Sequence, residues 1–299
     1  MELALKPLFI ERYKTLTDIE TFKKYCLTPL RKCIRINTLK ITSKELLQRV
    51  KGLDLKQIPW YKDGYWVENK EETSLGNMLE HKLGYFFVQE AASMIPPLVL
   101  NPTSKDIVLD ACAAPGSKTT QMAQIMENKG LIIANDKTTL RIKALSANVQ
   151  RCGVTNTVIT QHDVRQIKEP FSKILLDVPC SSTGTIRGST KRTIATMSAY
   201  KPNLVKSIAG MQKNLLMHCY NNLLQEKGTL VYSTCSLEPQ EDEEVISHLI
   251  EKTDAKIEKI DLDIKSKVNS DDKELQKCIK LWPQSYDTEG FFIAKIKKP

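Results

Sequence analysis

The sequence predicts an α/β protein built on a mostly parallel, doubly wound sheet and preceded by a small α+β unit. From about residue 104, short β-branched runs alternate with segments of helical periodicity, which is typical of a parallel sheet covered by helices on both faces. The first 92 residues instead show a helix–strand–helix–strand–strand order. With 299 residues, of which 41% are hydrophobic, the chain can bury a sizeable core. We therefore expect an N-terminal unit at 1–92 and a larger domain at 93–299.

The N-terminal unit is expected to hold two helices and three strands. These are a helix at 15–25, a strand at 35–39, a helix at 43–51 capped by Thr42 or Ser43, and strands at 55–60 and 65–67 around a turn at 62–64. The βαββ order within it is common in platforms for single-stranded RNA, and a purely packing role is the alternative. The chain has 44 basic and 35 acidic residues, a net charge of +9, which favours contact with a polyanion such as nucleic acid.

The larger domain is expected to alternate strands and helices along the chain. Strands are predicted at 107–109, 131–134, 157–160, 174–176, 230–232 and 291–296, and helices at 117–126, 139–151, 203–224 and 241–251. Gly228 follows the long helix and is a signal for its end. The charged, weakly patterned segment 261–280 is predicted to be a surface insertion that forms a solvated loop.

Composition disfavours several classes of protein. Apolar runs such as residues 94–100 are far shorter than the roughly 20 residues of a membrane span, and the first residues do not resemble a signal peptide. Eight cysteines without a Cys-x-x-Cys pair indicate a reducing compartment and disfavour a zinc ribbon. We expect a cytoplasmic protein that binds neither membrane nor metal and, from its basic surface, a monomer.

The most unusual segment follows the first strand of the larger domain, where Asp110 begins the run Asp-Ala-Cys-Ala-Ala-Pro-Gly-Ser-Lys-Thr. Its small residues allow a ligand to approach the backbone closely, and the helix after it offers free amide groups to a negative group. The run lacks the Gly-x-Gly-x-x-Gly pattern of dinucleotide sites and the first glycine of the Walker loop. It therefore disfavours an oxidoreductase with a nucleotide cofactor and fits a carboxylate-bearing nucleoside such as S-adenosyl-L-methionine.

Acids at the next two strand ends also indicate a nucleoside site. Asp136 follows Asp110 by 26 residues, and an acid about 20 residues beyond such a loop commonly binds ribose hydroxyls. Asp163 follows the third strand, where its carboxylate could accept a hydrogen bond from an adenine amino group. Ligands of doubly wound sheets lie at these carboxyl ends, so the three acids together predict a nucleoside site.

Two cysteines, Cys180 and Cys235, follow the fourth and fifth strands. Carbon 5 of a pyrimidine is a poor nucleophile, but addition of a thiolate to carbon 6 enables carbon 5 to attack a methyl group. A base must then remove the proton on carbon 5 so that the thiol can leave. Asp177 is placed to act as an acid near ring nitrogen 3, provided that burial favours its protonated form. Five other cysteines are interpreted as small apolar residues: Cys26, Cys33, Cys152, Cys219 and Cys278.

Seven segments carry motifs that are found together in one family. They are Arg-Ile-Asn-Thr-Leu at 35–39, Gln-Glu-Ala-Ala-Ser at 89–93, the run at 110–119, Asp136 with Arg141, Asn148, Arg151 and Gly153, Asp-Val-Pro-Cys-Ser-Ser-Thr-Gly at 177–184, Ser-Thr-Cys-Ser at 233–236, and Gly-Phe-Phe-Ile-Ala at 290–294. In this combination the sequence resembles the Nop/Sun (Fmu) RNA cytosine-5 methyltransferases over residues 35–297. The resemblance implies a Rossmann-like class I methyltransferase fold with an RRM-like N-terminal subdomain.

The resemblance also implies roles for single residues. Family members bind S-adenosyl-L-methionine through positions that match Cys112, Ala113, Ala114, Pro115, Gly116, Ser117, Lys118, Asp136, Arg141, Asp163 and Asp177. The cysteine that matches Cys235 is the nucleophile, and the one that matches Cys180 assists release of the methylated base. DNA cytosine methyltransferases use their Pro-Cys cysteine as nucleophile, so Cys180 is the rival candidate. Lys118 is expected to contact either the cofactor or the target base, and with Asp177 it completes the expected catalytic set.

The departures from the family pattern concern the target. Val178 replaces the usual alanine, and residues 188–192 differ from the family in a loop near the substrate. Phosphate contacts are expected from Arg187, Lys191, Arg192 and Lys201. The compact chain most resembles the archaeal type that modifies tRNA, and rRNA is the alternative target. A non-catalytic RNA-binding or assembly factor is the alternative function.

Overall fold

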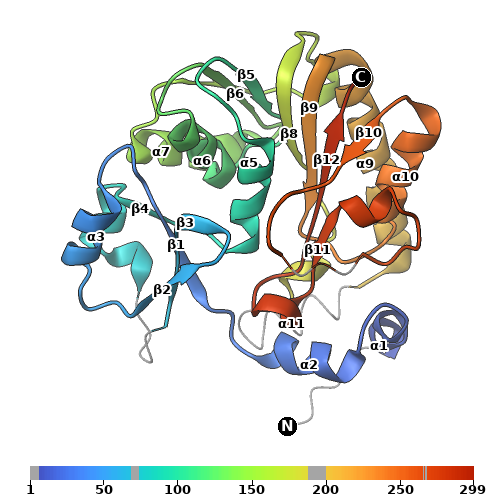
Figure 1. Ribbon diagram of the computed structural model, residues 1–299, viewed down its shortest axis with the longest axis horizontal. Coiled ribbons are helices and arrows are strands. Elements are labelled where there is room, and N and C mark those ends of the chain that lie inside the picture. Colours follow the sequence, from blue (N-terminus) through green and yellow to red (C-terminus); the bar gives the residue numbers. More distant parts are fainter. Residues whose placement is uncertain (1–6, 69–73, 188–199, 265, 267) are drawn as a thin grey trace.

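Two β-sheets organise the structure, a computed structural model that describes residues 7–68, 74–187, 200–264, 266 and 268–299 (Figure 1). The N-terminal part contains α1 (Pro7–Lys14), α2 (Ile19–Leu27), β1 (Lys32–Ile36), α3 (Ser43–Arg49), β2 (Leu55–Ile58), β3 (Tyr61–Val67), a 3₁₀ turn η1 (Leu75–Asn77), α4 (Leu79–Lys82) and β4 (Phe86–Val88). Its strands form an antiparallel sheet in the order β2-β3-β1-β4. The predicted βαββ order is present, and β4 adds a strand that the sequence did not reveal.

The hairpin of the N-terminal sheet turns earlier than predicted. Ile58 of β2 pairs with Tyr61 of β3, so the chain reverses between these two residues and the predicted turn at 62–64 is wrong. Residues 62–64 lie inside β3 instead. The start of α3 follows its sequence signal, because Thr42 and Glu45 form a reciprocal capping box.

The larger part holds the second sheet and the helices that cover it. Its elements are η2 (Ala92–Met94), α5 (Ile95–Leu100), β5 (Ile107–Asp110), α6 (Ser117–Ile125), β6 (Leu131–Asn135), α7 (Thr139–Cys152), β7 (Thr157–Thr160), η3 (Val164–Gln166), β8 (Phe171–Asp177), η4 (Thr183–Thr185), α9 (Pro202–His218), a π turn η5 (Cys219–Leu223), β9 (Leu224–Thr234), α10 (Glu243–Lys252), β10 (Lys256–Glu258), η6 (Leu275–Lys277), β11 (Ile279–Leu281), α11 (Pro283–Tyr286) and β12 (Phe291–Lys297). Across the described residues, no helix combines the length and apolar character needed to span a bilayer.

The large sheet is mostly parallel, as predicted. Its order is β10-β12-β9-β8-β5-β6-β7, and β11 pairs with β12 beside this path. Strands β9, β8, β5, β6 and β7 run in one direction, whereas β12 lies antiparallel to β9, β10 and β11. The carboxyl ends of the five parallel strands therefore meet at one edge of the sheet.

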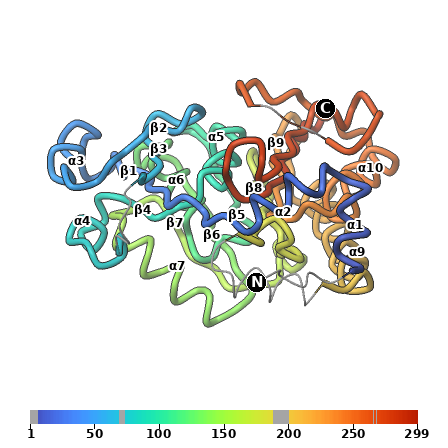
Figure 2. Tube along the Cα trace, turned by 90° about the horizontal axis from the view of Figure 1, so that it is seen from below, coloured from blue at the N-terminus to red at the C-terminus, as the bar shows by residue number. Residues whose placement is uncertain are grey.

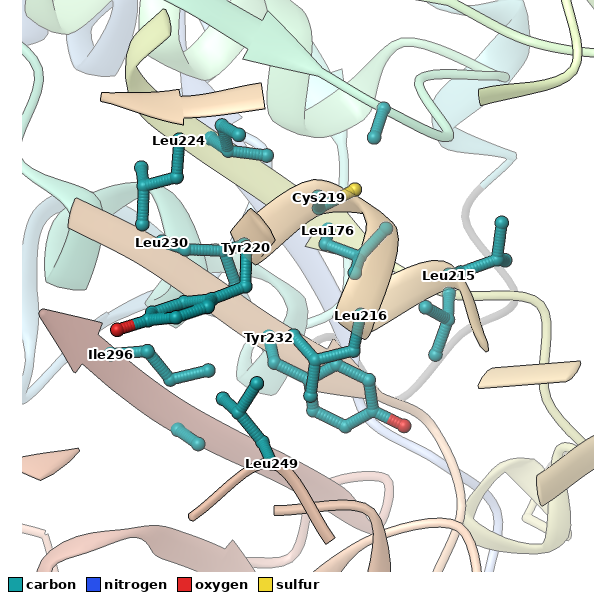
Figure 3. Packing of buried hydrophobic residues seen from close by; sticks show 14 of the residues in the cluster. Leu176, Leu215, Leu216, Cys219, Tyr220, Leu224, Leu230, Tyr232, Leu249 and Ile296 are labelled. Carbon is teal, nitrogen blue, oxygen red and sulfur yellow. The ribbon is translucent and has the colours of Figure 1, made fainter. Parts of the chain in front are cut away.

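Alternate residues of the central strands fill a core on each face of this sheet. One cluster includes Leu176, Leu230, Tyr232 and Ile296 of the strands and Leu216, Tyr220 and Leu249 from the helical side (Figure 3). The other includes Val108, Leu175, Val231, Ile293, Ile95 and Met122. Burial of each such large side chain contributes roughly 1.5–3 kcal/mol. Helices α9 and α10 thus cover one face and α5 and α6 the other, which is the doubly wound arrangement.

Helix α9 is shorter than the predicted helix at 203–224. It ends at His218, the π turn follows, and β9 begins at Leu224, which pairs with Phe171 of β8. Pairing across the sheet overrides the local helical periodicity. Gly228 consequently lies within β9.

The end of the segment 261–280 departs from the solvated surface insertion that its charges predicted, although the described residues of 261–274 are exposed or partly exposed. Leu275, Cys278 and Ile279 are buried, and Lys280 is 0% exposed. The ammonium of Lys280 lies 3.0 Å from Asp242 and 2.8 Å from Glu243. A buried lysine of β11 thus forms ion pairs with two buried carboxylates near the start of α10. The sequence did not indicate these pairs because the residues lie far apart in the chain.

The first two helices contact the larger part of the molecule. Figure 2 shows the chain passing from α1 and α2, beside the larger part, across to β1. Arg12 of α1 forms an ion pair with buried Glu238 at 3.0 Å, and Phe22 of α2 packs edge-on against Trp282 at 5.9 Å between ring centroids. The first helices are therefore anchored on the larger part rather than on the N-terminal sheet.

Arg35 of β1 fastens the N-terminal sheet to α6. Its side chain is 0% exposed, and its guanidinium donates hydrogen bonds to Gln89 at 2.8 Å, to Thr120 at 2.7 Å and to Gln124. Thr120 and Gln124 belong to α6, the helix that follows the run at 110–119. The N-terminal sheet thereby fixes the helix on which the site loop depends.

Candidate active site

The predicted site residues gather at the carboxyl edge of the large sheet. Asp110 and Asp177 end β5 and β8, while Asp136 and Cys235 directly follow β6 and β9. Their contacts divide the edge into two regions. One is a cavity beside β6 and β7, here called the strand-end cavity, and the other is the pair of sulfurs of Cys180 and Cys235, here called the cysteine pair.

The strand-end cavity has a volume of about 530 Å³, within the range typical of small-molecule sites. Four of the predicted cofactor residues line it: Cys112, Asp136, Arg141 and Asp163. The other predicted positions, Ala113, Ala114, Pro115, Gly116, Ser117, Lys118 and Asp177, are not part of its lining as described. Ala113 and Ala114 pack against Leu145 and Val149 of α7 instead, so this stretch shapes the loop from behind.

Sequence reasoning missed the wall opposite the strand ends. Helix α9 and the segment after β7 supply this wall through Ser207, Gly210, Met211 and Asn214, and through His162, Val164 and Arg165. Helix α9 was expected only to cover the sheet. The signal that could have identified it is the small pair Ser207 and Gly210, three residues apart on one helix face.

Asp136 ties the loop after β5 to the end of β6. Its carboxylate accepts hydrogen bonds from the main-chain N–H of Ala114 at 3.3 Å and of Thr138 at 3.0 Å, and Arg141 pairs with it at 3.2 Å. Arg141 also donates to the carbonyl of Ala114 at 2.5 Å. Asp136 and Arg141 therefore hold the loop in place and border the cavity at the same time.

Asp163 presents a second carboxylate to the cavity. Hydrogen bonds from the Arg165 side chain, with further help from Lys137, hold the pKa of Asp163 well below its usual range. The group is thus an anion that can accept hydrogen bonds at any physiological pH. Two charged acceptors at successive strand ends suit a ligand that offers hydroxyl and amino donors.

The cysteine pair lies at the ends of β8 and β9. The Sγ atoms of Cys180 and Cys235 are 2.9 Å apart, and the hydroxyl oxygen of Ser182 lies 3.6 Å from the Cys235 sulfur. The hydrogen bond between the thiols lowers the pKa of Cys235 and, together with burial, raises that of Cys180. These directions favour Cys235 as the thiolate of the pair, and either sulfur can be the donor in their contact.

Lys118 of α6 links this pair to the sheet edge. Its ammonium donates to Asp177 at 2.7 Å and to the Ser93 hydroxyl at 3.1 Å. Burial alone would lower the pKa of Lys118, but the Asp177 carboxylate outweighs it and the pKa is raised. The other oxygen of Asp177 accepts from Ser233 at 2.7 Å. Both oxygens of Asp177 thus accept hydrogen bonds, one from Lys118 and one from Ser233.

The predicted phosphate contacts divide into three cases. Arg187 was predicted wrongly, because its side chain is 0% exposed. Its guanidinium donates to Asp287 at 2.5 Å, to the carbonyl of Thr288 at 3.1 Å and to that of Pro29 at 3.1 Å. Lys201 is exposed at the start of α9. Lys191 and Arg192 lie outside the described residues.

The described residues hold no side-chain cluster suited to a metal ion. No group of three or more His, Cys, Asp or Glu side chains in that part of the chain is arranged to hold an ion. The polar groups at the sheet edge pair instead with lysine, arginine and main-chain amides.

Comparison with known sequences places both parts of the chain. Residues 97–297 match the family described as 16S rRNA methyltransferase RsmB/F, and residues 5–91 match the N-terminal domain of 16S rRNA methyltransferase RsmF. A tRNA (cytosine(49)-C(5))-methyltransferase of Pyrococcus abyssi is 43% identical, over 97% of this chain and 95% of that protein. Ribosomal RNA small subunit methyltransferase F of Psychromonas ingrahamii is 42% identical over 94% of this chain, which spans 60% of that relative.

Solved structures show the same architecture. A methyltransferase homolog protein from Pyrococcus horikoshii is 32% identical and superposes with a TM-score of 0.84, over 99% of this chain and all of that one. NSun6 from the same organism, determined with SFG, superposes with a TM-score of 0.88 over 100% of this chain and 99% of that one at 24% identity, so it supports the fold. The chain therefore belongs to the RsmB/F family of methyltransferases, which confirms the Nop/Sun membership that its motifs predicted.

Proposed function

We propose that this protein transfers a methyl group from S-adenosyl-L-methionine to carbon 5 of cytosine in tRNA. The observation that carries the chemistry is the cysteine pair, with sulfurs 2.9 Å apart and the Lys118–Asp177 ion pair beside them. The choice of tRNA rests on the archaeal relative named for that activity, which has nearly the same length as this chain. The specific alternative is rRNA, favoured by the bacterial relatives named for it.

The strand-end cavity fits the methyl donor. Asp136 and Asp163 offer anionic acceptors to ribose hydroxyls and to an adenine amino group, and Cys112 borders the cavity next to the loop. Bound there, S-adenosyl-L-methionine would supply a methyl group on a positively charged sulfur, an electrophile that carbon 5 can attack. Pro179 lines the same cavity and directly precedes Cys180, so the donor site and the cysteine pair adjoin.

Cys235 and Cys180 divide the covalent steps. The Cys235 thiolate forms a bond to carbon 6, the C5=C6 electron pair shifts to form C4=C5, and the C4=N3 pair moves onto ring nitrogen 3. The Lys118 ammonium, held by Asp177, can stabilise this negative charge by a hydrogen bond. Carbon 5 then bonds to the methyl carbon, whose bond to the donor sulfur breaks. Loss of the carbon-5 proton to a base re-forms C5=C6 and expels the Cys235 thiolate. Cys180, whose sulfur adjoins that of Cys235, assists this release.

The target base must leave its stack to reach the cysteine pair, which costs a few kcal/mol. A net charge of +9 supplies the electrostatic attraction that offsets part of this cost, and exposed Lys201 is one contributor near the site. We also propose that the protein acts as a monomer in the cytoplasm, where reducing conditions keep its eight cysteines free.

The deciding experiment supplies purified protein with tritiated S-adenosyl-L-methionine and unmodified transcripts of tRNA or of 16S rRNA. Transfer to tRNA alone, mapped to cytosine by bisulfite sequencing, is the expected result. Transfer to rRNA alone would overturn the choice of tRNA while keeping the chemistry. If folded protein transfers no methyl group to either RNA, and a Cys235→Ser protein replaces the parent fully in cells, the non-catalytic alternative holds.

A further inference from the structure

The carboxylate of Glu241, just before α10, binds both loops that carry the cysteine pair. Its Oε2 accepts a hydrogen bond from the main-chain N–H of Ser181 at 2.9 Å. Its Oε1 accepts from the hydroxyl of Ser181 and from that of Ser236 at 3.0 Å. Ser181 directly follows Cys180, and Ser236 directly follows Cys235. One side chain thus clamps the residue after each sulfur.

Neighbouring groups hold the residues that precede the two cysteines. Gln212 of α9 donates to Oε2 of Glu241 at 3.0 Å and to the carbonyl of Pro179 at 2.9 Å. Asp242 accepts from the hydroxyl of Thr234 at 2.6 Å. Pro179 precedes Cys180 and Thr234 precedes Cys235. Each cysteine is therefore held on both sides by a single hydrogen-bonded frame.

This frame is dry. Glu241, Gln212, Asp242 and Ser236 are all 0% exposed. Hydrogen bonds to a buried carboxylate are strong because water does not compete for them, and a partner left unsatisfied there destabilises the fold. The frame is accordingly stiff, and removal of the Glu241 side chain leaves two hydroxyls, one amide of Gln212 and one main-chain N–H without their acceptor.

We propose that Glu241 is a positioning residue that holds the Cys180 loop against the Cys235 loop and so fixes the separation of the two sulfurs. The inference rests on the proposed function for the roles of the sulfurs, but the geometry it describes can be tested without RNA. Glu241 itself contacts neither sulfur in the described structure, and it does not line the strand-end cavity. Its effect should therefore reach the covalent steps and leave binding of the methyl donor unchanged.

The contacts of Glu241 predict how the Glu241→Gln variant should behave. The amide oxygen of glutamine can accept the two hydrogen bonds that Oε2 accepts in the parent, from the Ser181 main-chain N–H and from Gln212. The amide NH₂ of glutamine can donate to the hydroxyls of Ser181 and Ser236, which rotate to accept. Glutamine thus restores every contact without the charge. Alanine restores none. If hydrogen bonds hold the two loops, Glu241→Gln should keep the two sulfurs close together and Glu241→Ala should not.

The test measures sulfur proximity with phenylarsine oxide, which forms two arsenic–sulfur bonds to a pair of close thiols while its oxygen leaves as water with both thiol protons. Affinity is measured by titration, and mass spectrometry of peptides locates the linked cysteines. Parent protein and Glu241→Gln are expected to bind through Cys180 and Cys235, and Glu241→Ala to bind at least tenfold more weakly. In methyl transfer, Glu241→Ala should lower kcat at least tenfold and leave KM for S-adenosyl-L-methionine within twofold.

Glu243→Ala is the matched control. Glu243 is likewise buried, lies two residues away and pairs with Lys280 at 2.8 Å, so its loss also costs stability, yet no described contact joins it to Ser181 or Ser236. It should lower the melting temperature without changing arsenical affinity. If Glu241→Ala proves unfolded, Ser181→Ala with Ser236→Ala removes the two hydroxyl contacts and should weaken arsenical binding about threefold.

Three results would overturn the proposal. The first is parent-like arsenical affinity in Glu241→Ala, or in the double serine variant if Glu241→Ala is unfolded. The second is an equal loss of arsenical affinity in Glu243→Ala, and the third is a Glu241→Gln protein that binds the arsenical as weakly as Glu241→Ala. A parent protein that binds the arsenical through its two strand-end thiols but methylates no RNA would instead contradict the proposed function and leave the positioning role supported.

Discussion

The strand-end cavity and the cysteine pair occupy one edge of one sheet, yet they differ in their exposure to water. At the cavity, the carboxylates of Asp136 and Asp163 pair with Arg141, Arg165 and Lys137, whose side chains are 47%, 57% and 72% exposed. Around the cysteine pair, Glu241, Gln212, Asp242 and Ser236 are fully buried. Exposed ion pairs contribute little to stability and rearrange cheaply, whereas buried hydrogen bonds hold a fixed geometry. The edge thus joins an adaptable binding region to a rigid reacting region.

Cys235→Ala should have the largest effect, because it should abolish the reaction and leave cofactor binding unchanged. We expect methyl transfer to fall by roughly 10⁴-fold or more, because a covalent route loses its nucleophile. Calorimetric titration should show the affinity for S-adenosyl-L-methionine unchanged, since Cys235 is not among the residues that line the cavity. Cys278→Ala, a buried cysteine elsewhere, serves as control. Parent-level methylation by Cys235→Ala would rule out the assigned nucleophile.

Cys180→Ala should stop the reaction at a different point. The Cys235 adduct should still form but release slowly, so a protein–RNA species should accumulate on denaturing gels. The reason is that Cys180 adjoins the sulfur that must leave, at 2.9 Å. The opposite pattern, an adduct in Cys235→Ala and none in Cys180→Ala, would exchange the two roles.

Asp110 lies between the two regions, and its variant Asp110→Asn should change how stability depends on pH. Burial, with help from Asp177 and Asp136, raises the pKa of Asp110 to about 7, while hydrogen bonding from Thr119 and the charge of Lys118 oppose the shift. The folded chain therefore keeps this proton where the unfolded chain has lost it, and stability falls as the pH rises from about 4 to about 7. Asparagine should remove that fall, which is worth up to ~4 kcal/mol. Denaturant unfolding at pH 5 and pH 8 measures it; equal pH dependence in parent and variant would contradict it.

Asp136→Asn tests the adaptable region alone. Loss of the charge weakens the contacts with Arg141 and with the ribose, and the dissociation constant of S-adenosyl-L-methionine should rise roughly 10- to 100-fold. The rate at which iodoacetamide alkylates Cys235 should stay at the parent value. A large change in that rate would mean that the two regions are coupled and would weaken the comparison.

Lys201→Ala should have the smallest effect. Removing one exposed phosphate contact should weaken RNA binding a few-fold and reduce the slope of log affinity against log salt by about one. Lys129→Ala is the control, because Lys129 precedes β6 and so lies at the opposite edge of the sheet. Identical salt slopes for both variants would remove Lys201 from the RNA-binding surface.

The sequence predicted the parts of the fold that local signals determine. Alternating β-branched runs located strands β5 to β8, and the cap expected at Thr42 or Ser43 located the start of α3. The small-residue loop and the strand-end acids identified one wall of the cavity. These features are readable because the spacing of a few consecutive residues encodes them.

The parts that sequence reasoning missed depend on partners far away in the chain. From the sequence, Lys280 is interpreted as a solvated charge, but in the structure it is buried in ion pairs with Asp242 and Glu243. From the sequence, Arg187 is predicted to contact phosphate, but in the structure its guanidinium donates to Asp287 and to main-chain carbonyls. Glu241 has the appearance of an ordinary residue at a helix start, although it joins loops 60 and 5 residues away. Burial decides these cases, and burial follows from long-range packing.

The anchoring of α1 and α2 has a consequence for synthesis on the ribosome. Phe9, Tyr13 and Phe22 form one cluster with Leu237 and Trp282, and Arg12 pairs with a residue 226 positions later. Helices α1 and α2 thus leave the ribosome long before the residues that they contact, since contacts at such separation must wait for the intervening chain. Until Trp282 emerges, these aromatic rings remain in contact with water. Pulse proteolysis of nascent chains stalled before and after residue 282 should show protection of α1 only in the longer set.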